Sequence, residues 1–310
     1  MRPRVIAIVG ATATGKTALA MSLARALGGE VVNADSRQVY RGMDIGTAKP
    51  TTEERAAVPH WLIDVADPDE TFTLARFVDA ARGAIADIAA RGRQPIVVGG
   101  TGQYVWALVE GWRIPRVPPD PALRARYEAL LAERGITALA GALLAADPVA
   151  AASVDLRNPR RIIRALEVTE TTGRPYSAWR TKDPPPFDTT IAGLDMPRAA
   201  LHRRADARVE AMVAAGLVDE VRRLNAHGYG CGLPAFASIG YREMCAHLRG
   251  ELSLDEAVAR IKTETHRLIR MQHAWFRRDD ARIRWFDAAS PSLADDVLAA
   301  VNPSAGDGTS

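Results

Sequence analysis

The sequence predicts an α/β fold in which a parallel β-sheet is flanked by helices, and three observations support this prediction. A short apolar run at residues 5–9 precedes a glycine-rich loop and a helix-forming segment at residues 18–27. Further apolar runs at residues 30–33 and 94–98 each end in a polar or glycine-rich turn. Helical segments separate these runs, and short continuous apolar runs between helices are typical of buried parallel strands.

The loop after the first strand carries the phosphate-binding pattern G-x-x-x-x-G-K-[ST]. Gly10 and Gly15 let main-chain N–H groups turn toward one anion, and the helix start adds positive potential. We expect Lys16 to reach the outer phosphate and the Thr17 hydroxyl to hold Mg²⁺. The motif indicates a P-loop NTPase-like sheet that binds a di- or triphosphate, without showing that a nucleotide binds. The predicted diphosphate-binding residues are Gly10, Ala11, Thr12, Ala13, Thr14, Gly15, Lys16 and Thr17.

The second strand carries a polar segment to the edge of the sheet. Residues 30–33 form this strand, and residues 34–40 follow at its carboxyl end, where ligands bind in open α/β sheets. Asp35 there is either a turn aspartate or a functional carboxylate, and its place beside a phosphate site favours function. Residues 41–50, with two glycines and a proline, predict a loop of the kind that usually serves an active site.

Two more strands and two more helices complete this first part. Residues 60–64 favour a short strand or turn, in which His60 is more typical of a structural histidine than of a ligand. Apolar residues at a spacing near 3.6 predict a helix over residues 74–91. The strand that follows ends in the glycine-rich turn 99–102, where Thr101 either caps the next helix or hydrogen-bonds a ligand.

The composition changes at a cluster of prolines that begins with Pro115. From there to about Gly173 the pattern is helical and alanine-rich, with helices expected to open at Arg124 and Pro159. After this insertion the chain rejoins the sheet and continues mainly as helices. The later elements are predicted as a strand at 190–194, helices at 202–215, 217–224, from 238 and at 254–278, and a strand at 282–286. The predicted parts are a core of residues 1–114 and 190–288, a helical insertion of residues 115–189, and a disordered tail of residues 303–310.

Composition and charge exclude several classes of protein. The chain has 310 residues and a formal net charge of +3, without a run of five like charges. Arginines far outnumber lysines throughout the chain, so a cluster of arginines in this sequence is weaker evidence for nucleic-acid binding. The chain has two cysteines, Cys231 and Cys245, which cannot form a metal site by themselves. We expect both to be reduced thiols. We find no signal peptide and no apolar stretch near the roughly 20 residues of a membrane span, so we expect a cytoplasmic monomer without membrane contact.

Several stretches together resemble the tRNA dimethylallyltransferases, also called tRNA isopentenyltransferases. The phosphate loop alone is widespread, whereas ADSRQVYRGMDIGTAKPT at residues 34–51 is far more specific. The resemblance covers about residues 4–286 in family order. Its other stretches are VPHWLID (58–64), VVGGTGQY (97–104), PRRIIRALEVTETTG (159–173), RVEAMVAAGLVDEV (208–221), SIGYREM (238–244) and MQHAWFRRD (271–279).

The resemblance implies transfer of a dimethylallyl group from its diphosphate to N6 of the adenine directly 3′ of the tRNA anticodon. The phosphate loop would hold the diphosphate, with Mg²⁺ as cofactor, and the helical insertion would contact tRNA. Arg208 matches the family arginine that contacts the diphosphate. Asp35 matches the family aspartate that contacts N6, and Thr101 matches the threonine beside that site. Together with Lys16, these are the implied catalytic residues. The implied tRNA-binding residues are Asp35, Ser36, Arg37, Gln38, Thr101, Arg124, Pro159, Arg160, Arg161, Ile162, Ile163, Arg164, Gly232, Leu233, Pro234, Ala235, Phe236, Ala237, Thr265, Arg267, Arg270 and Gln272.

The sequence departs from the family pattern in several places. Ala11 and Thr14 replace a proline and a serine in the phosphate loop, which leaves the backbone donors unchanged. Met271 and Ala274 replace an arginine and a threonine in the last long helix, which removes one expected phosphate contact. No Cys/His zinc finger follows the core, unlike in the eukaryotic members.

Three alternative functions share some of these features. An adenylate isopentenyltransferase would use the same loop and Asp35 chemistry, but its small acceptor needs neither the helical segment 115–185 nor the basic helix 254–278. A P-loop small-molecule kinase would turn over ATP. A non-catalytic RNA-binding module would show no prenyl transfer although its loop residues are intact.

Overall fold

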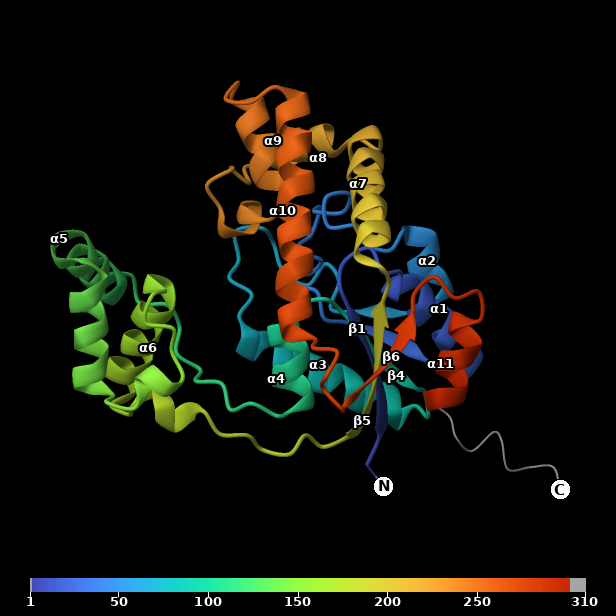
Figure 1. Cartoon of the computed structure of the whole chain (residues 1–310), viewed down its shortest axis with the longest axis horizontal. Coiled ribbons are helices and arrows are strands. Elements are labelled where there is room, and N and C mark those ends of the chain that lie inside the picture. Colours follow the sequence, from blue (N-terminus) through green and yellow to red (C-terminus); the bar gives the residue numbers. More distant parts are fainter. Residues whose placement is uncertain (1, 302–310) are drawn as a thin grey trace. The chain divides into compact units, whose positions relative to one another are not determined.

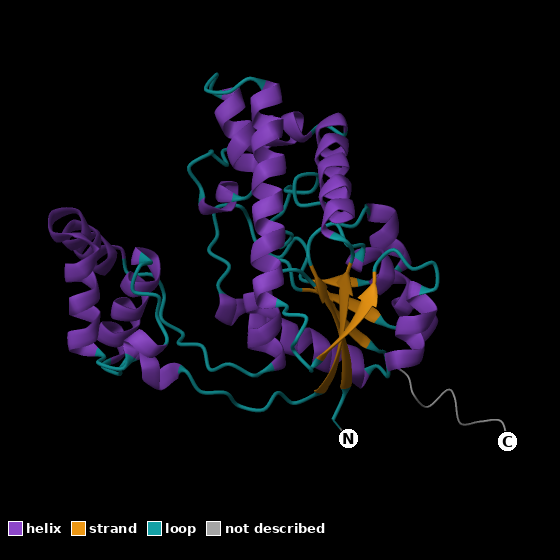
Figure 2. Ribbon diagram, viewed as in Figure 1, coloured by secondary structure: helices purple, strands orange, loops and turns teal. Residues whose placement is uncertain are grey.

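The computed structural model describes residues 2–301, which form two compact units (Figures 1 and 2). One unit consists of residues 110–184, and the rest of the described chain forms the other. The sequence placed these boundaries at 115 and 189, but the strand that rejoins the sheet begins at Asp188. The predicted disordered tail, residues 303–310, lies outside the described residues.

The larger unit is built on a six-stranded sheet whose strands all run parallel, which confirms the predicted α/β fold (Figure 2). The strand order is β3-β2-β4-β1-β5-β6, so the strand before the phosphate loop lies in the middle of the sheet. The buried pattern of β1, β2 and β4 matches their continuous apolar runs. The strands are β1 (Arg4–Gly10), β2 (Glu30–Asn33), β3 (His60–Trp61), β4 (Pro95–Val98), β5 (Asp188–Asp195) and β6 (Ile283–Asp287).

Helices cover both faces of this sheet (Figure 1). On one face, α1 (Lys16–Leu27) and α11 (Leu293–Val301) share a core with β1 and β4. On the other, α3 (Leu74–Ala90) packs against α4 (Gly102–Val109), and Phe77 stacks on Tyr104 with ring centroids 4.0 Å apart. Helix α11 was not expected from the sequence, because its apolar positions form too short a pattern to identify a helix.

The C-terminal helices of this unit enclose a second hydrophobic core (Figure 1). Its largest buried side chains include Phe236 and Tyr241, whose rings meet edge to face. Gly216 separates two helices as predicted, and the last long helix ends at Trp275 rather than near Arg278. These helices are α7 (Arg198–Ala214), α8 (Leu217–Ala226), α9 (Tyr241–Leu248) and α10 (Leu254–Trp275). A short helix, α2 (Thr52–Ala57), begins with a capping box between Thr51 and Glu54.

The two cysteines form a disulfide in this core, so the expectation of two reduced thiols is wrong. The Cα atoms of Cys231 and Cys245 are 5.9 Å apart, although 14 positions separate them in the sequence. The segment after α8 folds back onto α9 and brings the two sulfur atoms together. Such proximity is a tertiary property that spacing along the chain does not report.

The smaller unit is helical and contains α5 (Pro121–Ala146) and α6 (Pro159–Thr172) around their own core. The first helix opens at Pro121 rather than Arg124, because the Asp120 side chain caps it. By length and composition, α5 is the one described helix that is long and apolar enough to cross a membrane, contrary to our expectation. It breaks at Gly135, and Leu139 and Leu143 beyond the break are buried in the core shared with α6.

Candidate functional site

The phosphate loop follows β1 at the carboxyl edge of the sheet. Gly10 has a φ of 140°, and a Cβ atom there would lie 2.4 Å from the main-chain oxygen of Leu194. This contact with β5 excludes every other residue at the position. Gly15 has a φ of 91°, which turns the chain into α1. The glycines predicted from the motif are therefore required by the backbone of this loop.

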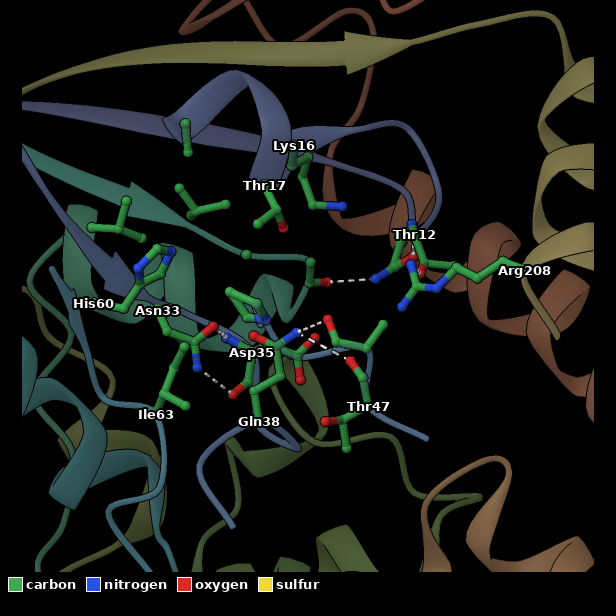
Figure 3. A pocket seen from close by; sticks show the side chains of 18 residues that line it. Thr12, Lys16, Thr17, Asn33, Asp35, Gln38, Thr47, His60, Ile63 and Arg208 are labelled. Atoms are coloured by element: carbon green, nitrogen blue, oxygen red, sulfur yellow. Dashed lines mark hydrogen bonds between the residues drawn. The ribbon is translucent and has the colours of Figure 1, made fainter. Parts of the chain in front are cut away.

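Two half-buried cations, Lys16 and Arg208, face the pocket that this loop borders (Figure 3). The Lys16 ammonium donates to the main-chain oxygen of Ala11 at 2.7 Å. Burial, together with the charge of Arg208, lowers the pKa of Lys16 to about 7, while Asp35 opposes this shift. Burial also lowers the pKa of Arg208. Such a site favours an anion, because a bound diphosphate would restore the charge that burial disfavours.

Gln272 ties helix α10 to both glycine-rich loops. Its side-chain oxygen accepts from the Thr12 backbone N–H at 2.8 Å, and its amide nitrogen donates to the Gly100 main-chain oxygen at 3.0 Å. The residue is only 6% exposed. The family resemblance assigned Gln272 to tRNA binding; its side chain lines the pocket and makes these two bonds. The Thr12 hydroxyl on the same loop accepts from Arg208 at 3.2 Å.

Asp35 lies at the end of β2 and lines the same pocket (Figure 3). Its Oδ1 atom accepts from the Arg37 backbone N–H at 2.8 Å, as in an Asx turn. Its own backbone N–H donates to the Asn33 side chain at 3.1 Å. Asp35 can therefore be both a turn aspartate and a functional carboxylate. One of its oxygens accepts the hydrogen bond of the turn, and no described residue hydrogen-bonds the other oxygen.

Thr101 holds this segment from the neighbouring strand rather than facing the pocket. Its hydroxyl oxygen accepts from the Ser36 backbone N–H at 3.0 Å and lies 3.3 Å from the Ser36 hydroxyl. Because β2 and β4 are adjacent in the sheet, the segments that follow them meet here. Thr101 thus positions the residue next to Asp35.

Sequence reasoning missed the residue that orders the adjoining loop. Glu220 of α8 is 1% exposed and accepts backbone N–H bonds from Asp44, Ile45 and Gly46 at 2.7–3.2 Å. Tyr241 donates to the same carboxylate, and burial of the phenol together with the adjacent Glu220 charge raises the pKa of this tyrosine. A buried acidic residue in an amphipathic helix was the available signal, but its partners are 174–176 positions away.

The pocket combines polar and apolar walls (Figure 3). Val31, Ile63 and Val98 contribute apolar surface, and Gln38 donates its amide to the main-chain oxygens of Thr47 and Ala48 at 3.1 Å. His60 also lines the pocket, and burial lowers its pKa. Its Nδ1 lies 2.7 Å from the Val58 main-chain oxygen, whereas the buried Nε2 has no partner among the described residues.

A metal ion at this site would depend on few protein ligands. The described residues contain no group of three or more His, Cys, Asp or Glu side chains that could hold one. The Thr17 hydroxyl lines the pocket (Figure 3), and no hydrogen bond to a described residue engages it. This donor set suits Mg²⁺, which commonly binds through a few protein oxygens, substrate phosphates and water.

The predicted tRNA-binding arginines of the smaller unit fall into two groups. Arg124 and Arg164 both pair with the fully buried Glu167, at 2.9 and 2.5 Å. Arg160 and Arg161 are exposed near the start of α6. Between these groups, Ile162 and Ile163 are buried in the core of the unit. Pro159 is half-buried at the first position of the helix.

The other predicted tRNA-binding segments belong to the larger unit. In the stretch 232–237, Ala235 and Phe236 are buried in the second core. The remaining members, Gly232, Leu233, Pro234 and Ala237, are exposed or half-buried. On α10, Arg267 and Arg270 are exposed, and the half-buried Thr265 donates to the Ile261 main-chain oxygen at 2.7 Å. Ser36, Arg37 and Gln38 adjoin the pocket beside Asp35.

Comparison with known protein families gives two matches. The model described as IPP transferase matches residues 38–279. The model described as isopentenyl transferase matches residues 3–65, which include the phosphate loop and Asp35.

Named relatives cover nearly the whole chain. A tRNA dimethylallyltransferase of Roseiflexus sp. (strain RS-1) is 58% identical over 274 residues, covering 88% of this chain and 90% of the relative. A tRNA dimethylallyltransferase of Thermomicrobium roseum is 51% identical over 290 residues, covering 94% and 88%. The matched segments therefore include both compact units.

Solved structures agree with these matches. The tRNA isopentenylpyrophosphate transferase of Bacillus halodurans is 40% identical with a TM-score of 0.71, covering 98% of this chain and 96% of its own. A eukaryotic dimethylallyltransferase, described as acting on tRNA, is 28% identical with a TM-score of 0.81, covering 97% and 79%. Both likenesses extend over the sheet, the pocket and the helical unit.

Proposed function

This chain belongs to the IPP transferase family, and we propose that it transfers a dimethylallyl group from dimethylallyl diphosphate to tRNA. The acceptor is N6 of the adenine directly 3′ of the anticodon, and diphosphate is released. The observation that carries this proposal is the meeting of a phosphate loop, two half-buried cations and Asp35 in one pocket with an apolar wall. A prenyl diphosphate has the matching parts, an anionic head and a small apolar tail.

The donor side of the pocket supports binding of the diphosphate. Backbone N–H groups at the start of α1 form an anion site, and Lys16 and Arg208 add charge. The apolar residues Val31, Ile63 and Val98 offer a surface for the dimethylallyl carbons. These features also explain why a phosphate loop need not indicate ATP chemistry.

The transfer step uses one carboxylate and the leaving-group site. The N6 nitrogen forms a bond to the allylic C1 carbon while the bond from C1 to the diphosphate oxygen breaks. The electron pair of that bond leaves with the diphosphate, whose developing charge Lys16 and Arg208 stabilise. Asp35 accepts the proton that N6 loses, through the oxygen that the turn does not use. The adenine must leave its stack to reach the site.

We further propose that Mg²⁺ is the cofactor and that the Thr17 hydroxyl holds it. When bound, the ion supplies positive charge that helps the diphosphate depart. We also propose that the enzyme acts in the cytoplasm, where its tRNA acceptor is available, and that it is a monomer.

The test is incubation with radiolabelled dimethylallyl diphosphate and either bulk tRNA or AMP. We expect label in tRNA, in an adenosine with an added dimethylallyl group, and none in AMP. Label in AMP would instead support an adenylate isopentenyltransferase. ATP turnover with a small acceptor would support a kinase, and tRNA binding without any transfer would support a binding module.

A further inference from the structure

Lys49 carries a buried positive charge that the proposed transfer does not use. Its side chain is only 2% exposed. The ammonium donates to three acceptors, which are the main-chain oxygen of Tyr40 at 2.5 Å, the Asp44 carboxylate at 2.7 Å and the Asp64 carboxylate at 2.5 Å. An ammonium group has three N–H donors, so these bonds satisfy it completely. Lys49 therefore has no donor left for a substrate and instead joins separate segments of the chain.

The segments that Lys49 joins contain strained backbone. Ala48, Leu62 and Asp64 have φ angles of 49°, 63° and 56°. Residues other than glycine rarely adopt this left-handed conformation, and it persists only where the surrounding contacts enforce it. Lys49 supplies such contacts, because it follows Ala48 directly and binds one oxygen of Asp64. Arg55 holds the other oxygen of Asp64 at 2.6 Å.

Both strained turns are bonded to residues that line the pocket (Figure 3). The Gln38 amide nitrogen donates to the main-chain oxygen of Ala48 at 3.1 Å. The main-chain oxygen of Leu62 accepts from the Asn33 side-chain amide at 3.0 Å. The Asn33 side-chain oxygen in turn accepts from the Asp35 backbone N–H at 3.1 Å. The two turns are thus connected to Gln38 and to the carboxylate of the proposed transfer.

We propose that Lys49 is a positioning residue, which fixes the two turns that hold Gln38 and Asp35 in place on the acceptor side of the pocket. This inference rests on the proposed function and adds to it a residue that contacts neither substrate. A rigid anchor is important for such a reaction, because a displacement of about 1 Å between reacting groups can lower a rate roughly 10²-fold.

The test compares Lys49→Met with the wild type in single-turnover transfer at saturating donor and tRNA. Methionine occupies a similar space but has no N–H donor, so the three segments lose their common bond. We expect the transfer rate to fall roughly 10- to 100-fold. Affinity for inorganic diphosphate should stay at the wild-type value, because Lys49 does not contact the phosphate loop. Amide hydrogen exchange should become faster at residues 47–49 and 62–64.

Arg91→Met is the matched control for the loss of an ion pair. Arg91 binds Glu30, whose side chain is 2% exposed, at the opposite end of β2 from Asp35. This variant should lose thermal stability but transfer at the wild-type rate when it is assayed well below its Tm. Its hydrogen exchange at residues 47–49 and 62–64 should also match that of the wild type.

Three results would overturn the inference. The first is a wild-type transfer rate in folded Lys49→Met, and the second is an equal loss of rate in Arg91→Met. The third is a fall in diphosphate affinity as large as the fall in rate, which would assign Lys49 to the donor side instead.

Asp64→Asn provides a second variant, which carries the test if Lys49→Met does not fold. It removes the charge that pairs with Lys49 but keeps an oxygen and the size of the side chain. We expect slower transfer and faster exchange at the same residues, and a wild-type rate would again overturn the inference. In the double variant the losses should be less than multiplicative, because both substitutions act on one contact. Wild-type protein that transfers no prenyl group would contradict the proposed function, whereas the exchange measurements would still test the anchor.

Discussion

The positive charges at the phosphate loop and those on helix α10 differ in their surroundings. Lys16 and Arg208 are half-buried in the pocket, and this partial burial lowers the pKa of both. Arg267 and Arg270 extend from α10 into solvent. A buried charge interacts strongly with an adjacent anion and is little affected by salt, whereas an exposed charge is hydrated and screened. The comparison indicates that the first pair fixes the donor and the second pair attracts the acceptor.

A third set of cations shows why composition alone is misleading. Arg124 and Arg164 share the buried carboxylate of Glu167, so part of their charge stabilises the smaller unit. Arg160 and Arg161 on the same helix are exposed. All of these arginines look alike in the sequence, and only their partners separate a structural role from an RNA contact.

The largest effect is expected at Asp35, whose charge interacts with Lys16 and Arg208. Asp35→Asn keeps an oxygen that accepts the Arg37 N–H bond, so the turn is preserved, but it cannot take the N6 proton. Single-turnover transfer should fall roughly 10²–10⁴-fold, while donor and tRNA affinities change far less. A variant that transfers at the wild-type rate would show that Asp35 serves the turn only.

The role of the positive charge at the phosphate loop is tested by replacing Lys16. Lys16→Ala should lower the transfer rate roughly 10²–10³-fold, the usual loss for one charge-stabilising donor. Since the pKa of Lys16 is about 7, free enzyme loses this charge as pH rises above that value. The kcat/KM for dimethylallyl diphosphate should therefore decline above about pH 7. Lys16→Arg remains charged and should lack the decline; a decline that persists in this variant would assign it to another group.

The role of the exposed arginines on α10 is tested through the salt dependence of tRNA binding. Replacing both Arg267 and Arg270 with Gln should weaken tRNA binding and reduce the slope of log K against log salt by roughly 0.7–0.9 per lost contact. Arg25→Gln removes an exposed arginine at the far end of α1 and serves as the control. A slope that stays at the wild-type value in the double variant would mean that these arginines only solvate the helix.

Much of the site follows from local sequence. The order of strand, glycine loop and helix places Lys16 and Thr17 at a phosphate site, because backbone conformation there depends on nearby residues. The polar segment at Asp35 and the turn at Thr101 were placed at the same sheet edge, since the carboxyl ends of parallel strands meet there. The predicted sites that lie inside, such as Phe236 and Ile162, illustrate the limit of assigning contacts by segment.

The tertiary structure decided how distant elements meet. The strand order, the bond from Gln272 to Thr12, the Glu220 carboxylate under residues 44–46 and the disulfide all join parts far apart in sequence. By itself, the sequence determined the phosphate loop and the fold class, because each follows from short-range geometry and a repeated apolar pattern. Side-chain partners depend on the packing of whole elements, and only that packing places the Trp275 indole against Gly102.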